Sequence, residues 1–295
     1  LNFERDNISQ LLLERLGLKS RVRKDGLAKW RNFVSRVKNP KGEVKIAIVG
    51  KYFDTGDFVL ADAYISVIEA IKHSAAKLGV KANLTWLNSK KLETGEEKVE
   101  SLKNYAGVIV PGGFGESGIE GKLAVIKFCR ENKIPYLGLC YGMQLMCVEL
   151  ARNVLKLKDA NTTEINPETN APVIDIMPAQ KKKLMEANYG GSMRLGAYPA
   201  ILKEGTIAAR AYSVKEISER HRHRYEVNPE FIEKLEQAGL VFSGRSPDGK
   251  LMEIAELPRK AHPFFLGTQF HPEFKSRPLS PHPLFTEFLK ICVKR

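Results

Sequence analysis

The chain has 295 residues, 43% of them hydrophobic, and a formal net charge of +13 from 47 Lys and Arg against 34 Asp and Glu. This composition supports a sizeable core, and no stretch approaches the roughly 20 apolar residues of a membrane span, which argues against a membrane protein. Basic residues stand beside acids, as in 97–103, and no aromatic-studded basic motif occurs, so solvated surfaces explain the charge better than a nucleic-acid partner.

A partner or small ligand that carries phosphate stays compatible with the charge. The chain opens with Leu-Asn-Phe-Glu-Arg and shows no basic segment followed by an apolar one, which suggests a fragment without a signal peptide. Its four cysteines form no Cys-x-x-Cys pair, which predicts free thiols in a reducing, cytoplasmic compartment. The close pair His221 and His223 is interleaved with arginines, whose charge would repel a cation, so no metal site is expected.

The first 40 residues predict two short amphipathic helices. Apolar side chains recur at helical spacing at Ile8, Leu11, Leu12 and Leu16, and again at Trp30, Phe33 and Val34. A Pro- and Gly-containing linker follows at 39–42. We therefore expect a helical tail or linker over 1–42 and one larger domain over 43–295.

From residue 44 onward, apolar β-rich runs alternate with helical stretches. The expected strands are 45–49, 82–87, 107–110 and 135–139, and the expected helices are 61–78, a short polar helix before 107, 121–131 and one that begins at Tyr141. Strand alternating with helix over this length predicts an α/β fold with a doubly wound, mainly parallel central sheet flanked by helices.

Beyond residue 154 the alternation is less regular. Segment 161–170 is polar and turn-rich, 172–177 is compatible with a strand, and 181–191 predicts a surface loop. Shorter strands are expected at 240–244, 251–256 and 264–269, before a final amphipathic helix from His282.

The most informative segment is an apolar strand that runs into Gly138-x-Cys140-x-Gly142 and then a helix. This pattern is typical of a nucleophile elbow, in which flanking glycines permit a tight strand-to-helix turn that presents the central side chain. A cysteine there lies at a helix N-terminus, which favours the thiolate. The alternative is a plain buried cysteine in a Gly-rich turn.

A late segment pairs with this cysteine. His271 and Glu273 follow a strand-like run and are two residues apart, so in extended chain they point to the same side. His271 is then a candidate base for the thiol, with Glu273 orienting the imidazole. The alternative is a surface His and Glu before a turn.

The loop 111–115 follows the strand 107–110 and is rich in glycine. Its exposed N–H groups make the amide of Gly113, together with that of Tyr141, a candidate oxyanion site. A simple tight turn is the alternative. Phosphate binding is a weaker interpretation, because no Gly-Lys-Ser/Thr follows.

These three pieces in this order resemble the class I glutamine amidotransferases, and further segments resemble the glutaminase domains of the CTP synthase family. The supporting segments are 49–52, 62–70, 152–154, 159–164, 190–196 and 219–228, the last containing an Arg-His-Arg-His-Arg run. The likeness extends over about 44–293. The first 40 residues resemble the tail of a synthetase domain much less distinctively.

The resemblance implies glutamine hydrolysis through a thioester on Cys140 and assigns the residues that line the substrate. Those residues are Gly113, Tyr141, Gly142, Met143 and Gln144, with Glu164 and Arg224 holding the amino-acid head. A free amino acid is a zwitterion, so an acid for its ammonium and a guanidinium for its carboxylate make physical sense. The alternative for Glu164 and Arg224 is a pair of ordinary surface charges.

The resemblance also implies partners outside this domain. The domain itself needs no cofactor, while a synthetase domain absent from this chain uses ATP, Mg and UTP, with GTP as an allosteric activator. The full-length family forms homo-tetramers. Two other functions stay open: a cysteine peptidase of the same fold, and a catalytically silent module that senses glutamine or docks a synthetase.

Three features depart from the family pattern. Position 141 is Tyr where CTP synthases more often carry Leu, and Cys-Tyr-Gly-Met-Gln resembles the GMP synthetase form. Because Tyr141 acts through its backbone, the oxyanion site should stay intact, although the pocket wall is open to change. An insertion at 55–60 and the lysines at 181–183 are expected to alter how GTP couples the two domains.

Overall fold

A computed structural model describes residues 2–19, 27–50, 54–55, 58–59, 64–113, 117–176 and 193–295. The expected surface loop 181–191, with its lysines at 181–183, lies outside the described residues, as do residues 51–52, 62–63, 114–115 and 190–192 of the family-like motifs. Of the insertion at 55–60, only backbone is described, in the two-stranded pair β2 (Asp54–Thr55) and β3 (Phe58–Val59).

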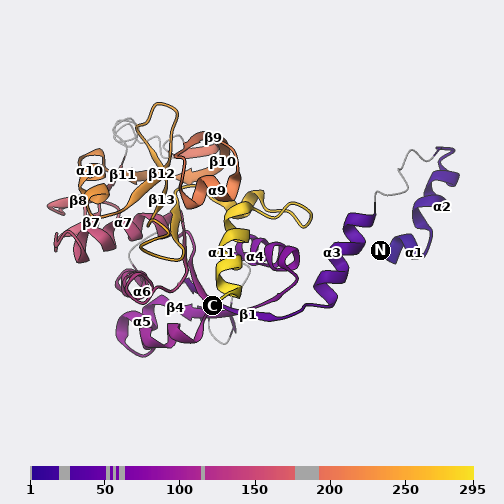
Figure 1. Cartoon of the computed structure of the whole chain (residues 1–295), viewed down its shortest axis with the longest axis horizontal. Helices are drawn as coiled ribbons and strands as arrows, with labels where there is room; N and C mark the ends of the chain where they lie inside the picture. Colours follow the sequence, from indigo (N-terminus) through magenta and orange to yellow (C-terminus); the bar gives the residue numbers. More distant parts are fainter. Residues whose placement is uncertain are drawn as a thin grey trace.

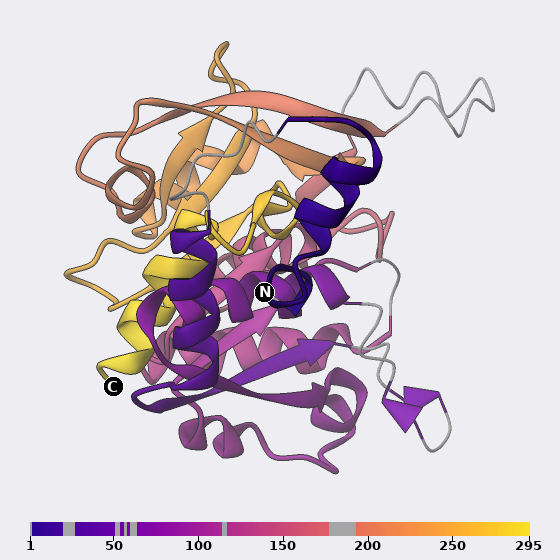
Figure 2. The ribbon, with the colours of Figure 1, turned by 90° about the vertical axis from the view of Figure 1, so that its right-hand side faces the viewer.

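The N-terminal segment forms α1 (Asn2–Arg5), α2 (Ile8–Arg15) and α3 (Ala28–Lys38), and none of their residues is buried. Figure 1 shows that these helices stand apart from the sheet, with α3 on the side of α4, and Figure 2 views the chain from that side, with the helices in front. Arg36 of α3 donates to the carbonyl of Lys77 at 2.9 Å. Strand β1 begins at Glu43, directly after the linker.

The described strands form a nine-stranded sheet in the order β10-β9-β12-β13-β14-β6-β5-β1-β4. The parallel half contains β1 (Glu43–Gly50), β4 (Lys81–Asn88), β5 (Gly107–Val110), β6 (Tyr136–Leu139) and β14 (Phe265–Thr268). The first four are the alternating runs from which the doubly wound sheet was predicted, β14 was expected among the shorter strands of the last third, and the mixed α/β fold with flanking helices is confirmed. All four residues of β5, β6 and β14 are buried, as expected for central parallel strands.

The other half of the sheet is antiparallel and extends beyond β14. It contains β13 (Met252–Glu256), β12 (Val241–Arg245), β9 (Arg194–Leu202) and β10 (Glu216–His223). The sequence predicted the first two of these strands and not the long β9–β10 pair. In β10 every second residue is buried, but the buried set includes Glu219, His221 and His223, so its hydrophobic periodicity is weak.

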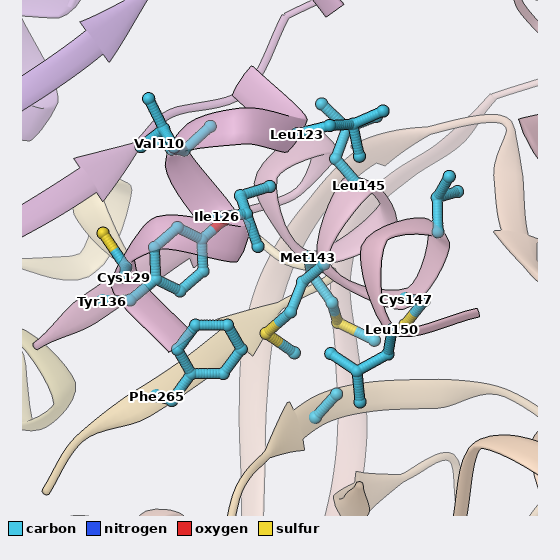
Figure 3. Close-up of a cluster of buried hydrophobic side chains, with 14 of the residues drawn as sticks. Val110, Leu123, Ile126, Cys129, Tyr136, Met143, Leu145, Cys147, Leu150 and Phe265 are labelled. Carbon is cyan, nitrogen blue, oxygen red and sulfur yellow. The ribbon is translucent and has the colours of Figure 1, made fainter. Parts of the chain in front are cut away.

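Helices cover both faces of the sheet (Figure 1). On one face α4 (Ile65–Leu78), α9 (Ile207–Tyr212) and α11 (Pro283–Val293) pack over a core that includes Ile48 and Ile109. On the other face α6 (Ile119–Glu131) and α7 (Tyr141–Asn153) pack over Val108 and Val110, with α5 (Ser89–Thr94) and the 3₁₀ helix η2 (Val99–Asn104) beside them. Figure 3 shows part of this second core, with Met143 among Tyr136, Phe265 and Leu150.

A second sheet of three strands combines two strands that follow α7 in the chain with one that follows β10. It contains β7 (Ala160–Thr162), β8 (Ala171–Ile176) and β11 (Tyr225–Val227), in the order β11-β8-β7. Helix α10 (Pro229–Gln237) follows β11 and places Phe231 and Leu235 in the core. None of the described helices has the length and apolar character needed to cross a membrane.

Candidate active site

Cys140 lies at the turn between β6 and α7, where it occupies the N-cap position of the helix. Its φ is +50° and its ψ is −97°, a conformation that non-glycine residues rarely adopt and that costs on the order of 1–3 kcal/mol. A hydrogen bond to the neighbouring strand β14 helps hold the residue in this conformation, because the amide of Cys140 donates to the carbonyl of Thr268 at 2.6 Å. A strained residue held this firmly at a helix N-terminus fits the predicted elbow.

The two glycines of the elbow are required for close packing. A Cβ on Gly142 would lie 2.3 Å from the carbonyl oxygen of Val110, and one on Gly138 would lie 2.7 Å from the carbonyl carbon of Gly142. The carbonyl of Gly142 also accepts a hydrogen bond from the buried hydroxyl of Tyr136 at 2.9 Å. Neither glycine has a positive φ, so the absent side chains let α7 approach β5 and β6, while Cys140 takes the unusual conformation.

His271 and Glu273 follow β14 and meet beside Cys140. His271 Nδ1 and Glu273 Oε1 are 2.7 Å apart, and the amide of His271 donates to the carbonyl of Arg220 in β10 at 2.8 Å. The expectation that extended chain would align the two side chains is wrong, because Pro272 begins the 3₁₀ helix η4 (Pro272–Lys275). The contact forms through that turn, and the ring of Phe274 stacks on the imidazole at 5.1 Å between centroids.

The charge of the imidazole depends on these neighbours. Burial disfavours the charged form of His271, but the carboxylate of Glu273 and the hydrogen-bonded Cys140 outweigh it and hold the pKa of His271 well above its usual range. These neighbours stabilise an imidazolium, which keeps a proton donor beside the cavity that Cys140 lines.

The loop after β5 closes against this pair. A Cβ on Gly112 would lie 3.0 Å from His271 Cε1 and 3.7 Å from Cys140 Cβ, so the backbone of the loop touches both residues. Gly113 is next in this loop, and Tyr141 supplies the first N–H of α7. A cavity of about 380 Å³ opens here, lined by Gly112, Gly113, Cys140, His271 and Glu273 together with the start of α4 and Arg222. Both proposed oxyanion donors therefore lie on segments that adjoin the sulfur.

The two proposed head-group residues adjoin strands of the second sheet and are not among the residues that line the Cys140 cavity. Glu164 follows β7 and Arg224 precedes β11, and these strands flank β8. The pKa of Tyr225 is raised by burial and then by the charge of Glu164, and it is lowered by that of Arg224. Both charges thus act on one phenol, although 60 residues of sequence separate them. Arg224 Nε is shielded from solvent and has no hydrogen-bond partner among the described residues.

The remaining expected site residues point elsewhere. Met143 is fully buried in the core against Gly267, so its side chain does not face the cavity of Cys140. Tyr141 is 1% exposed, and the ammonium of the buried Lys122 lies 5.2 Å from its ring centroid. The tyrosine that departs from the family pattern is thus packed inside the domain rather than in the wall of that cavity.

A buried polar network beneath the site was not expected from the sequence. Arg194 bonds Glu253 at 2.7 Å and Glu226 at 3.3 Å, and His221 and His223 lie beside them, 3.0 Å from each other. Burial first, and then the charge of Arg194, lower the pKa of His221 to about 2 and that of His223 to about 3. The alternation of charged and histidine side chains in β10 was the available signal.

The charge beside the histidine pair does not come from the neighbouring arginines of the same strand, as the sequence suggested. Arg220 and Arg222 are exposed on the opposite face of β10, and the cation that adjoins His221 and His223 is Arg194. Within the described ranges, no three His, Cys, Asp or Glu side chains are grouped to hold a metal ion.

Residues 59–291 match the family model described as glutamine amidotransferase class-I. The chain is similar to the CTP synthase of Sulfolobus acidocaldarius, with 53% identity over 99% of this chain and 53% of that protein. It is similar to the CTP synthase of Methanocaldococcus jannaschii, with 51% identity over 97% of this chain and 52% of that protein. The chain spans about half the length of these curated relatives.

A solved structure gives the same relation at the level of the fold. The Trypanosoma brucei CTPS glutaminase domain with bound acivicin is 37% identical, with a TM-score of 0.78, and the match covers 85% of this chain and 94% of that one.

Proposed function

Because the chain belongs to the class I glutamine amidotransferase family, among the glutaminase domains of CTP synthases, we propose that it hydrolyses L-glutamine to glutamate and ammonia. The observation that carries the proposal is the contact between three groups from distant parts of the chain. Cys140 on its strained turn lines one cavity with His271 and Glu273, and His271 bonds Glu273 at 2.7 Å. Titratable groups placed in this way at the edge of a cavity mark working sites.

In the first half of the reaction, the thiolate of Cys140 attacks the amide carbon of glutamine. The C–N bond breaks, the imidazolium of His271 gives its proton to the departing nitrogen, and ammonia leaves behind a glutamyl thioester. In the second half, neutral His271 takes a proton from water, whose oxygen attacks the thioester; the C–S bond then breaks, glutamate leaves, and Cys140 returns to the thiolate beside the imidazolium. The amides of Gly113 and Tyr141 stabilise each tetrahedral oxyanion, and loss of one such donor costs about 3 kcal/mol.

Selection of a free amino acid falls to Glu164 and Arg224. The carboxylate of Glu164 binds the ammonium group of glutamine, and the guanidinium of Arg224 binds its α-carboxylate. The buried Nε of Arg224, which has no partner within the described residues, supports this assignment because a shielded donor is costly without a ligand. Gly142, Met143 and Gln144 are proposed to act through the backbone at the start of α7, because the side chains of Met143 and Gln144 are buried behind the nucleophile.

The ammonia then serves a reaction in a part of the protein that this chain lacks. Residues 1–42 form the linker to a synthetase domain, residues 43–295 are the amidotransferase domain, and the synthetase domain uses ATP, Mg and UTP to make CTP. GTP is the activator and the intact protein is a homo-tetramer. The exposed apolar side chains of α1 to α3, such as Phe3 at 73% and Leu16 at 67%, support contact with a further domain.

Glutamate release by the purified chain tests the proposal. Cys140→Ala is expected to abolish release, whereas Cys292→Ala, which removes a buried thiol in α11, is expected to retain it. Free glutamine should be the substrate, and glutamine blocked within a peptide should not be, because a blocked glutamine lacks the ammonium and carboxylate that Glu164 and Arg224 are proposed to bind. Hydrolysis of the blocked peptide would favour a peptidase. Glutamine binding without glutamate release in calorimetry would favour a silent sensing module.

A further inference from the structure

A row of buried amide groups connects Cys140 to the second sheet. Gln269 Nε2 lies 3.7 Å from Cys140 Sγ, Gln144 Nε2 lies 3.3 Å from Gln269 Oε1, and Gln144 Nε2 also lies 2.9 Å from the carbonyl oxygen of Tyr225. Gln269 is fully buried and Gln144 is 2% exposed. Groups buried this deeply must satisfy their hydrogen bonds from one another.

The direction of these hydrogen bonds is fixed from one end. A backbone carbonyl can only accept, so Gln144 must present its NH₂ group to Tyr225. The same NH₂ group faces Gln269, which must therefore accept with its oxygen. The NH₂ group of Gln269 is left facing the sulfur of Cys140. Reversing either amide would bring two donors or two acceptors together.

We propose that Gln269 is a further catalytic residue, which donates a hydrogen bond to the thiolate of Cys140 and holds the sulfur in line for attack on the substrate. This inference rests on the proposed glutaminase function. The thiolate then has two donors, the imidazole of His271 and the amide of Gln269, and a hydrogen bond to a charged acceptor is roughly twice as strong as a neutral one.

The position of Gln269 in the chain supports the assignment. It follows β14, its own amide donates to the carbonyl of Glu253 at 2.8 Å, and His271 is only two residues further on. The carbonyl that fixes the amide row belongs to Tyr225, the neighbour of Arg224. The acceptor that orients the amides behind the nucleophile thus begins β11, and the proposed carboxylate-binding residue directly precedes that strand.

The competing explanation is that Gln269 only supports Gln144 and β11. Two substitutions separate the roles. Gln269→Leu removes both the donor and the acceptor, whereas Gln269→Glu keeps an oxygen for Gln144 and replaces the donor by a carboxyl group beside the sulfur. The matched control is Gln237→Glu, which makes the same change on the exposed face of α10.

The pH dependence of iodoacetamide alkylation measures the effect on the sulfur directly. Cys140 lines the cavity, whereas burial raises the pKa of Cys129 and Cys292, and raises that of Cys147 to about 12, so fast alkylation reports Cys140. Loss of a hydrogen bond to a charged group should move the midpoint of the profile up by about one to two pH units in Gln269→Leu. Gln269→Glu should move it up as well, and Gln237→Glu should leave it in place.

Glutamine turnover supplies the second readout. We expect kcat to fall about 10- to 100-fold in Gln269→Leu with little change in KM, because the lost contact acts on the nucleophile rather than on the substrate. A folded Gln269 variant that keeps the wild-type alkylation midpoint would overturn the inference. A wild-type chain that releases no glutamate would instead overturn the proposed function, and the alkylation profile would still test Gln269.

Discussion

Replacing Gly142 by alanine should damage both the stability and the activity of the chain. The new Cβ would lie 2.3 Å from the carbonyl oxygen of Val110, about 1 Å inside the 3.4 Å at which ordinary contacts begin. Both partners are rigid, since Val110 is fully buried in β5 and Gly142 lies in α7. Overpacking of this kind costs about 1–3 kcal/mol. The gain in helix propensity from Gly to Ala, at most about 1 kcal/mol, offsets only part of that.

The same displacement should affect catalysis. Val110 ends the strand that leads into Gly113, so relieving the clash moves the proposed oxyanion donor away from Cys140. A misplacement of about 1 Å can cost on the order of 100-fold in rate. Urea unfolding and glutamate release measure the two effects, and Gly42→Ala is the control because nothing lies within 4 Å of its added Cβ. A Gly142→Ala variant with wild-type stability and kcat would refute this account of the elbow.

Three further predictions concern the charged groups. Glu273→Gln removes a charge that keeps the pKa of His271 high, so His271 should lose its proton at a lower pH. The alkaline fall in kcat/KM should therefore move to lower pH, and an unchanged pH profile would contradict the role of Glu273. Arg224→Met should raise the KM for glutamine at least 10-fold, measured by steady-state kinetics, whereas an unchanged KM would exclude the carboxylate contact. Arg194→Met should lower the free energy of unfolding, measured in urea, by about 3–5 kcal/mol, because it leaves Glu253 buried without the arginine that it now bonds at 2.7 Å. A loss below about 1 kcal/mol would contradict this prediction and show that water replaces the guanidinium.

Local patterns in the sequence were sufficient to predict the parallel half of the fold. The runs at 107–110 and 135–139 are short and apolar throughout, which is what a strand buried on both faces requires. Each run is followed by glycines, which mark the turn that ends the strand. The elbow could also be predicted, because Gly138 and Gly142 stand at positions where any larger residue would clash with the backbone. The packing of Tyr141 against Lys122 could not be predicted, because it joins α7 to α6 and the hydrophobic pattern of one helix carries no information about its contacts with another.

The antiparallel half and the polar network depend on contacts between distant segments. Strand β10 places His221 and His223 inward, against the usual rule that buried positions are apolar, so its period of two was hidden. Those histidines are accommodated because Arg194 of β9 lies beside them and itself pairs with Glu253 of β13. No local window contains these partners, and the role proposed for Gln269 likewise appears only once Cys140 and Gln144 lie next to it.

The covalent chemistry of Cys140 is the central claim, and mass spectrometry of the modified chain tests it most directly. A glutamine analogue with an electrophilic carbon in place of the amide should add once, on the peptide that contains Cys140, and excess free glutamine should slow the reaction. Addition at Cys129, Cys147 or Cys292 instead, or labelling of Cys140 that glutamine does not slow, would contradict a glutamine-specific cysteine nucleophile.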